Sequence, residues 1–229
     1  MKHTLTSAFY FCAILSSPAA IIWTGATNND PFEDANWDFS GSAVAAVDSN
    51  VSIADDVTIT GGNLVMPNLA GQVRLQLGNG FTMTLDNSTI GLVGGGNDGA
   101  GGEPAGTGVN INLLNGSELN TFFIVNGVAL DIDATSSATF GGGGNPVNLS
   151  TVNLTSGSVL AFSAETPAQF TTEHLSKVTV NGAPAVDGVN IVIEAFNGAS
   201  GSRITVIPEP SSSLLIVLGG LAFTARRRQ

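Results

Sequence analysis

Cysteine is almost absent from this chain of 229 residues, which contains only Cys12. Cys12 lies in an apolar run from Ala8 to Leu15 that has the length of a signal-peptide core, and small residues follow at positions 17–19. We therefore expect residues 1–19 to be a signal peptide, cleaved near Ala19 or Ala20. Its removal leaves no cysteine, which excludes disulfides, thiolate catalysis and cysteine-based zinc sites from the mature protein.

Basic residues are also scarce between the two ends of the chain. From Ala20 to Ile207 only Arg74, Lys177 and Arg203 are basic, and they stand against seventeen carboxylates. This region lacks the basic footprint that binds DNA or RNA, so we expect no nucleic-acid partner. The excess of negative charge suits a soluble protein outside the cell.

Histidine is limited to His174 once the signal peptide is removed. One histidine excludes a histidine-rich metal site within one chain, and Glu173-His174 lacks the second histidine of a zincin motif. No Gly-x-Ser-x-Gly elbow is present to carry a serine nucleophile. We expect His174 to be a surface residue on a short helical segment, at most two turns long, between Phe170 and Lys177. The prediction is a protein that is not an enzyme and has no cofactor.

The carboxylates offer two further candidate sites. Asp131 and Asp133 would share one face of a strand, and a polysaccharide-active enzyme would need them to converge with a basic residue such as Lys177. Asp30, Glu33 and Asp34 could together contact calcium in the loop 28–34, although no EF-hand spacing is present. A solvated acidic loop is the favoured interpretation of that segment, so we predict no metal site.

Short runs that alternate between apolar and polar residues dominate the body. They predict strands with one buried face at residues 57–60, 73–77, 81–85, 109–113, 152–155, 178–180 and 189–193. Turns rich in glycine and asparagine separate these runs. The glycine cluster from Gly94 to Gly108 is interpreted as a loop. The fold class is therefore all-β.

Three segments share the form strand, glycine turn, small polar residue, strand. They are residues 58–64, 112–119 and 153–160, with residues 75–81 as a looser fourth copy. Their spacing, marked by Gly62, Gly80, Gly116 and Gly157, corresponds to one or two rungs of roughly twenty residues with insertions. We favour a small parallel β-helix, or solenoid, in which each rung buries its apolar face against its neighbours. A β-sandwich of jelly-roll type is the alternative.

Both tryptophans lie near the start of the mature chain, at Trp23 and Trp37. They could cover the open end of a solenoid as a cap, or they could form a platform for sugar rings. A cap predicts buried indoles, whereas glycan contact predicts two exposed indoles side by side. This opening loosely resembles the start of other exported bacterial β-solenoid proteins.

The C-terminus combines three elements in a fixed order. Pro208-Glu209-Pro210 forms an extended polar break because proline fixes φ and lacks a backbone donor. Residues 211–225 carry no charge and contain an apolar run from Leu214 to Phe223; as a helix they would span roughly 22 Å, which is short against a hydrocarbon core of about 30 Å. Arg226, Arg227 and Arg228 follow, and by the positive-inside rule they remain cytoplasmic and leave the body outside.

These residues, with Ile207 before them, resemble the PEP-CTERM protein-sorting signal, which covers about a tenth of the chain. The resemblance implies export in a Gram-negative bacterium that produces exopolysaccharide, with an exosortase as the partner that processes the chain near the Pro-Glu-Pro. It implies passage through the inner membrane as an intermediate, then release to the cell surface or the extracellular space. Ile207 departs from the valine that is commonest at this place.

Three segments are thus expected: a signal peptide at 1–19, an exported all-β domain at 20–207, and a PEP-CTERM signal at 208–229 with its transmembrane helix at 211–225. The expected function is a structural or adhesive role at the surface or in a biofilm matrix, where extracellular polysaccharide is a candidate partner. The alternatives are a carbohydrate-binding module and a polysaccharide-active enzyme.

Overall fold

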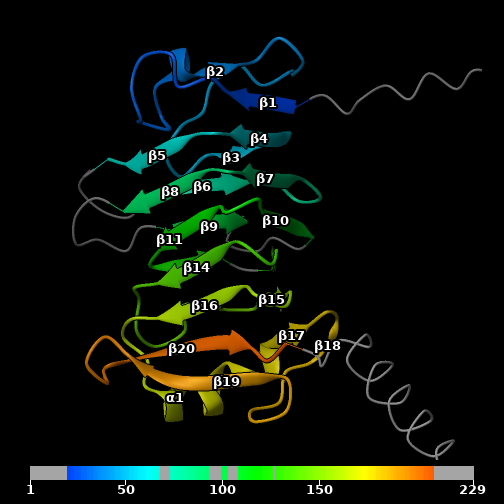
Figure 1. The fold of residues 1–229 in the computed structure, drawn as a ribbon. Helices are drawn as coiled ribbons and strands as arrows, with labels where there is room; N and C mark the ends of the chain where they lie inside the picture. The colour runs from blue at the N-terminus through cyan, green and yellow to red at the C-terminus, as the bar shows by residue number, and fades with distance from the viewer. Residues whose placement is uncertain (1–19, 68–72, 93–98, 103–107, 126, 209–229) are drawn as a thin grey trace, which may run out of the picture.

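The computed structural model describes residues 20–67, 73–92, 99–102, 108–125 and 127–208. Within these ranges the protein is an all-β fold (Figure 1) with one short α-helix, α1 (Pro167–Glu173), and two 3-10 helices, η1 (Asp34–Asn36) and η2 (Leu175–Lys177). None of its helices in these ranges has the length and apolar character needed to cross a membrane. The expected signal peptide at 1–19 and the expected membrane helix at 211–225 lie outside the described residues.

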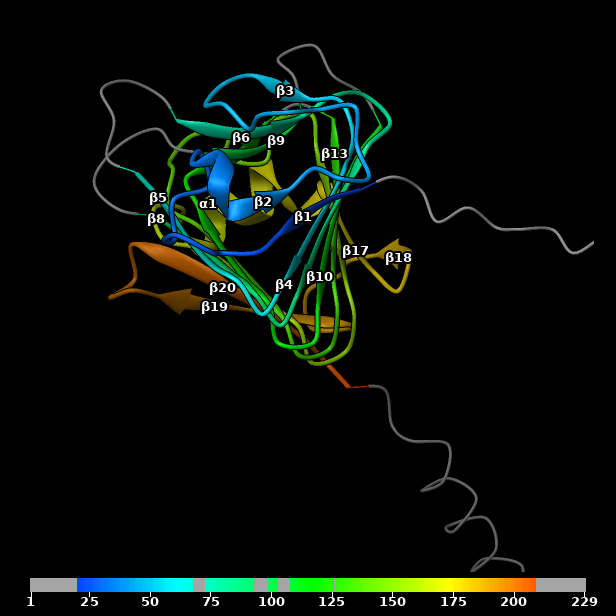
Figure 2. The same ribbon diagram turned by 90° about the horizontal axis from the view of Figure 1, so that it is seen from above.

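The strands form three sheets around a common interior, as the view along the stack shows (Figure 2). The nine-stranded sheet contains β1 (Ala20–Trp23), β2 (Trp37–Asp38), β4 (Asp56–Thr60), β7 (Thr82–Asp86), β10 (Val109–Leu114), β13 (Val128–Ile132), β15 (Thr151–Leu154), β17 (Val178–Val180) and β18 (Ala183–Pro184). The seven-stranded sheet contains β5 (Asn63–Met66), β8 (Thr89–Leu92), β11 (Glu118–Thr121), β14 (Ser137–Phe140), β16 (Val159–Phe162), β19 (Ile191–Phe196) and β20 (Gly201–Val206). The four-stranded sheet contains β3 (Ser52–Ile53), β6 (Arg74–Leu77), β9 (Gly99–Gly102) and β12 (Phe123–Val125).

From β4 to β12 consecutive strands enter the three sheets in turn, and from β13 to β17 they alternate between the nine- and seven-stranded sheets. β4, β5 and β6 lie in the nine-, seven- and four-stranded sheets, and β7, β8 and β9 repeat that order beside them in parallel. Such a set of strands is one turn of the chain. The length of a turn varies, because Met83 pairs with Ile111 at an offset of 28 residues and Ile111 pairs with Leu130 at an offset of 19.

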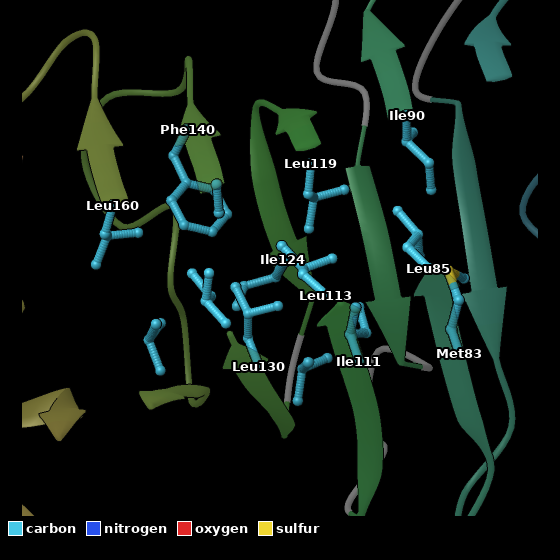
Figure 3. Close-up of a cluster of buried hydrophobic side chains, with 14 of the residues drawn as sticks. Met83, Leu85, Ile90, Ile111, Leu113, Leu119, Ile124, Leu130, Phe140 and Leu160 are labelled. Carbon is cyan, nitrogen blue, oxygen red and sulfur yellow. The ribbon is translucent and has the colours of Figure 1, made fainter. Parts of the chain in front are cut away.

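Alternation within each strand decides what fills the interior. In β10, for example, Val109, Ile111 and Leu113 are buried while the residues between them reach the surface. The close-up shows such side chains from successive turns directed toward one another (Figure 3). Burying a Leu or Ile side chain contributes about 1.5–3 kcal/mol, so the repeated apolar layers account for much of the stability of the stack.

A column of serines lines the corner between the nine- and seven-stranded sheets. Ser88, Ser117, Ser136 and Ser158 occupy equivalent positions in successive turns, and Gly62 precedes them in the same column. All four serines are buried. The Gly62 N–H donates to Ser88 Oγ over 3.0 Å, and the Ser117 N–H donates to Ser136 Oγ over 3.0 Å. The hydroxyls thereby satisfy backbone donors where the chain bends and the ladder is interrupted.

Both ends of the stack carry strands that break the parallel pattern. At one end β2 pairs antiparallel with β1. At the other end β18 pairs antiparallel with β17, while β20 pairs antiparallel with both β16 and β19. The helix α1 packs against β19 and β20 at this second end (Figure 1). The last turns of the apolar interior are therefore covered by local segments.

Two sequence expectations need correction. The cluster Gly94–Gly108 is not only a loop, since β9 within it pairs in parallel with β6 and β12. Glycines carry no side-chain alternation, so the pattern could not reveal a strand that its neighbours define. Gly80 lies between β6 and β7, whereas Gly62, Gly116 and Gly157 lie between strands of the nine- and seven-stranded sheets, so the looser fourth copy belongs to a different corner.

The strand and helix predictions otherwise fit the described elements. Each of the seven alternating runs overlaps a strand, and the short helical segment expected from Phe170 to Lys177 corresponds to α1 and η2. The helix begins earlier than expected, at Pro167, because Thr166 and Gln169 form a capping box around it.

Candidate functional site

The strongest candidate site is a cluster of ionisable residues at the α1 end of the stack. The capping box places α1 directly after Glu165: Gln169 Oε1 accepts the Thr166 N–H at 2.9 Å, and Thr166 Oγ1 accepts the Gln169 N–H at 3.4 Å. The helix ends at Glu173 and is capped by His174, whose backbone N–H donates to Phe170 O. Glu165 therefore precedes α1 and His174 follows it, and ligand atoms of the two side chains lie within 4.8 Å of each other.

His174 is buried, with 1% of its surface exposed. Its imidazole stacks on the ring of Phe162 with centroids 5.3 Å apart and planes only 4° apart. Its Nδ1 lies 3.5 Å from Lys177 Nζ, and its Nε2 is buried without a hydrogen-bond partner among the described residues. The expectation that His174 lies at the surface was wrong. The rings of Phe140, Phe162 and Phe170 contact one another, and the imidazole of His174 packs against them.

Glu165 is buried to the same degree, and one of its two carboxylate oxygens has a hydrogen-bond partner in the described residues. Its Oε1 accepts the Gly144 N–H at 2.6 Å, while its Oε2 is buried without a hydrogen-bond partner in the described part of the chain. Burial raises the pKa of the Glu165 carboxyl; the Gly144 hydrogen bond opposes this rise and the charge of Glu173 adds to it. A buried acceptor left unmatched costs free energy, so this oxygen needs a partner.

The neighbouring charges act on the histidine. Burial lowers the pKa of His174, the Lys177 ammonium lowers it further, and Glu173 opposes both. Burial also lowers the pKa of Lys177, again against the influence of Glu173. Lys177 is held in place by Asn145 Oδ1 at 2.7 Å and Val147 O at 3.1 Å, which accept from its Nζ. The cluster thus favours an uncharged imidazole, the form that accepts a proton or binds a cation.

Glu173 completes the cluster from the surface. One potential ligand atom from each of Glu165, Glu173 and His174 lies within 4.8 Å of the others, and Glu173 is exposed. It is the one group of three or more His, Cys, Asp or Glu residues in the described ranges that could hold a metal ion. Sequence reasoning missed it, although Glu165 stands just before a capping box and Glu173-His174 lies at the end of its helix.

The two tryptophans lie at the opposite end of the stack. Trp23 and Trp37 are each 6% exposed, and their rings meet edge to face with centroids 4.9 Å apart. Trp37 Nε1 donates to Pro31 O at 2.8 Å. Because neither indole presents a face to solvent, the arrangement fits a cap and provides no sugar platform.

The candidate calcium ligands serve their own loop. Asp30 Oδ1 accepts the Phe32 N–H at 2.9 Å and Asp34 Oδ1 accepts the Val47 N–H at 3.0 Å. The buried Asn36 organises the same loop, since its Oδ1 accepts the N–H groups of Thr27 and Asn28. Among the described residues, Asp30, Glu33 and Asp34 do not form a group that could hold a metal ion.

Asp131, Asp133 and Lys177 have separate partners. Asp131 Oδ1 accepts from Asn153 Nδ2 at 2.9 Å on the outer face of the nine-stranded sheet. Asp133 binds the backbone of Asn115 and Thr135, whereas the Lys177 ammonium is directed to Asn145 and Val147. These contacts do not assemble the acid and base of a polysaccharide-active enzyme.

The sorting residues lie mostly beyond the described ranges. Pro208 is exposed after β20. Glu209, Pro210 and the arginines at 226–228 are outside the described residues.

No protein-family model, curated protein or solved structure matches this chain.

Proposed function

We propose that this chain is an exported structural protein of a bacterial surface or extracellular matrix, built as a parallel β-helix and sorted by an exosortase. Parallel pairing in all three sheets supports the β-helix over the jelly roll, which is built from antiparallel strands. Antiparallel pairs occur in the described residues only with β2, β18 and the β19–β20 hairpin, the segments that cover the two ends.

Closure of both ends is the observation that carries the structural role. An open stack of strands offers unpaired edges and apolar side chains to other chains. Here the Trp23–Trp37 pair covers one end, and α1 with the β19–β20 hairpin covers the other. A rod closed in this way leaves its outer faces as the surfaces for contact with other molecules.

The place where the chain leaves the β-domain supports cleavage by an exosortase. β20 ends at Val206, and Pro208 is exposed immediately afterwards. A protease could therefore reach the start of the Pro-Glu-Pro motif without unfolding the body. The apolar segment and three arginines of the tail then serve to hold the chain in the inner membrane until cleavage.

The mass of the C-terminus tests the sorting proposal. The full chain is expressed in a Gram-negative host with and without a co-expressed exosortase, and the C-terminal peptide is measured by mass spectrometry. We expect a shortened C-terminus only with the exosortase. Glu209→Ala should prevent the shortening and Ser212→Ala should not; an identical C-terminus in both hosts contradicts the proposal.

A polar file on the nine-stranded sheet favours polysaccharide as the contact partner. Its members share one register position on the outer face of successive strands: Thr58, Thr84, Asn112, Asp131, Asn153 and Thr179. Asn153 donates to Asp131, and Thr179 Oγ1 donates to Asn153 Oδ1 at 2.9 Å, so the amide and hydroxyl groups are held in place. A row of ordered hydrogen-bonding groups suits the hydroxyls of an extended glycan.

Co-sedimentation with exopolysaccharide tests this second proposal. Asn112→Arg places a bulky side chain in the middle of the file and should reduce the bound fraction severalfold. Asn63→Arg places the same side chain on an exposed position of the seven-stranded sheet and should leave binding unchanged. Equal binding by the two variants contradicts polysaccharide contact through the polar file.

A further inference from the structure

The ionisable cluster at the α1 end has two buried atoms that lack hydrogen-bond partners in the described residues. Glu165 Oε2 and His174 Nε2 are both buried without hydrogen-bond partners in the described residues, and each side chain is 1% exposed. Glu165 Oε1 already accepts the Gly144 N–H, and His174 Nδ1 lies 3.5 Å from Lys177 Nζ. A group that pairs with one carboxylate oxygen and one imidazole nitrogen would satisfy both.

We propose that Glu165, Glu173 and His174 bind a divalent transition-metal cation, of which Zn²⁺ fits best. One imidazole nitrogen and two carboxylate oxygens are a donor set that zinc accepts. Calcium and magnesium prefer oxygen ligands alone, so the imidazole disfavours them. Three protein ligands leave a coordination position of a tetrahedral ion for water or another molecule.

The distances fit a site that closes by a small movement. Ligands at about 2.0–2.2 Å from a tetrahedral zinc ion lie about 3.3–3.6 Å from one another. The three ligand atoms lie within 4.8 Å, so the site closes on the ion by a movement of roughly 1 Å. Glu173 can make that movement because it is the exposed member, at the last residue of α1.

The surroundings hold the two buried ligands in place. The face of His174 stacks on Phe162, and Nε2 is the ring nitrogen without a hydrogen-bond partner in the described residues, so Nε2 is the nitrogen available to a cation when the imidazole proton lies on Nδ1. The backbone of Gly144 orients the Glu165 carboxylate. Such outer contacts are the usual means by which a protein orients metal ligands. The zinc would join α1 to the segment before it, at the end of the stack that the helix covers.

Zinc binding by the full-length protein tests the proposal. The purified chain is treated with a chelator, exchanged into metal-free buffer, and titrated with Zn²⁺ in competition with a chromophoric zinc indicator. We expect one zinc per chain and a rise in melting temperature on addition of zinc. A large molar excess of Ca²⁺ should not displace the ion; displacement would mark a general acidic surface and overturn the proposal.

Two variants separate this site from other carboxylates. Glu173→Gln changes an exposed side chain and should weaken zinc binding by about tenfold or more, with the circular dichroism of the protein unchanged. Glu118→Gln removes an exposed carboxylate on β11 and should bind zinc as the unaltered chain does. No stoichiometric zinc in the unaltered chain, or equal affinity in the two variants, overturns the proposal. Neither result bears on exosortase cleavage, which depends on the tail.

Discussion

Ser117 Oγ accepts the backbone N–H of Ser88 over 3.1 Å, although 29 residues separate the two serines in sequence. The same hydroxyl donates to Leu114 O at 2.6 Å, so one side chain satisfies a backbone group in each of two adjacent turns. The corner between the nine- and seven-stranded sheets is therefore held by side-chain hydroxyls in addition to the strand ladders.

Ser117→Ala is expected to destabilise the protein by about 1–3 kcal/mol, because it leaves the buried Ser88 N–H without an acceptor. The measurement is urea unfolding followed by circular dichroism. Ser176→Ala, at an exposed position of η2, is the matched control and should change the free energy of unfolding by less than about 0.5 kcal/mol. Equal effects of the two substitutions would mean that the serine column contributes nothing to stability.

Trp37→Ala is expected to cost about 3–5 kcal/mol, since it removes a buried aromatic side chain from the end of the stack. Trp37→Phe keeps an aromatic ring but leaves Pro31 O without the indole donor, so its cost should be smaller, about 1–2 kcal/mol. Thermal unfolding followed by circular dichroism gives both values without relying on tryptophan fluorescence.

The exposed Val189 supplies the control for the cap. Val189→Ala, at a side chain that is 69% exposed, should alter stability by no more than about 0.5 kcal/mol. A Trp37→Ala variant as stable as Val189→Ala would contradict the capping role and reopen the question of what the indole pair does.

Gly142→Ala is expected to destabilise the protein by about 1–3 kcal/mol, because a Cβ at this position would lie 2.5 Å from the backbone oxygen of Phe122. The close approach is required by the hydrogen bond from Gly142 N–H to that same oxygen, at 2.9 Å. Gly143→Ala is the neighbouring control: its nearest contact would be Ala164 Cβ at 3.7 Å, an ordinary van der Waals distance.

Gly143→Ala should be neutral or slightly stabilising, since alanine restricts the unfolded chain more than glycine does. Urea midpoints of the two variants measured side by side decide the matter. If Gly142→Ala unfolds at the same urea concentration as Gly143→Ala, adjacent turns do not approach as closely as the geometry requires.

The sequence predicted best those strands in which one face is buried and the other polar. The alternating run at 109–113 is such a case, because buried Ile111 lies between the partly exposed Asn110 and Asn112. The strand at 99–102 could not be found in this way, as it contains three glycines and an alanine and depends on pairing with β6 and β12. The alternation of apolar and polar residues within a strand indicates which side chains are buried. Pairing between strands of adjacent turns depends instead on residues distant in sequence.

The candidate site was missed for the same reason. Whether His174 is exposed depends on Phe162, a residue of the preceding turn whose ring receives the imidazole. Glu165 becomes a partner of this histidine only because the capping box begins α1 directly after it. The sequence contains both signals, but neither indicates that the two side chains meet inside the protein.

Asp133 gives a pH-dependent prediction. Its Oδ2 accepts the Asn115 N–H at 2.6 Å and its Oδ1 accepts the Thr135 N–H at 2.9 Å. Burial alone would raise the pKa of Asp133, but hydrogen bonds from Asn115, Ser136 and Thr135 outweigh it and lower the pKa below its ordinary value. A carboxyl whose folded pKa is lowered contributes stability that is present above its unfolded pKa, about 3.9, and is lost as pH falls through the folded pKa.

Asp133→Asn should therefore destabilise the protein at neutral pH, by about 1 kcal/mol after allowance for solvent screening, and the difference should shrink as pH falls below about 4. Urea unfolding of both proteins at several pH values from about 7 to about 3 measures it. Asp48→Asn, which removes an exposed carboxylate, is the matched control and should change the free energy of unfolding at neutral pH by less than about 0.5 kcal/mol. If the free energies of unfolding of Asp133→Asn and the unaltered chain differ by the same amount at every pH in this range, the substitution acts only through the poorer fit of the amide side chain. The lowered pKa of Asp133 would then play no part in holding the turn after β13 against the turn at Asn115.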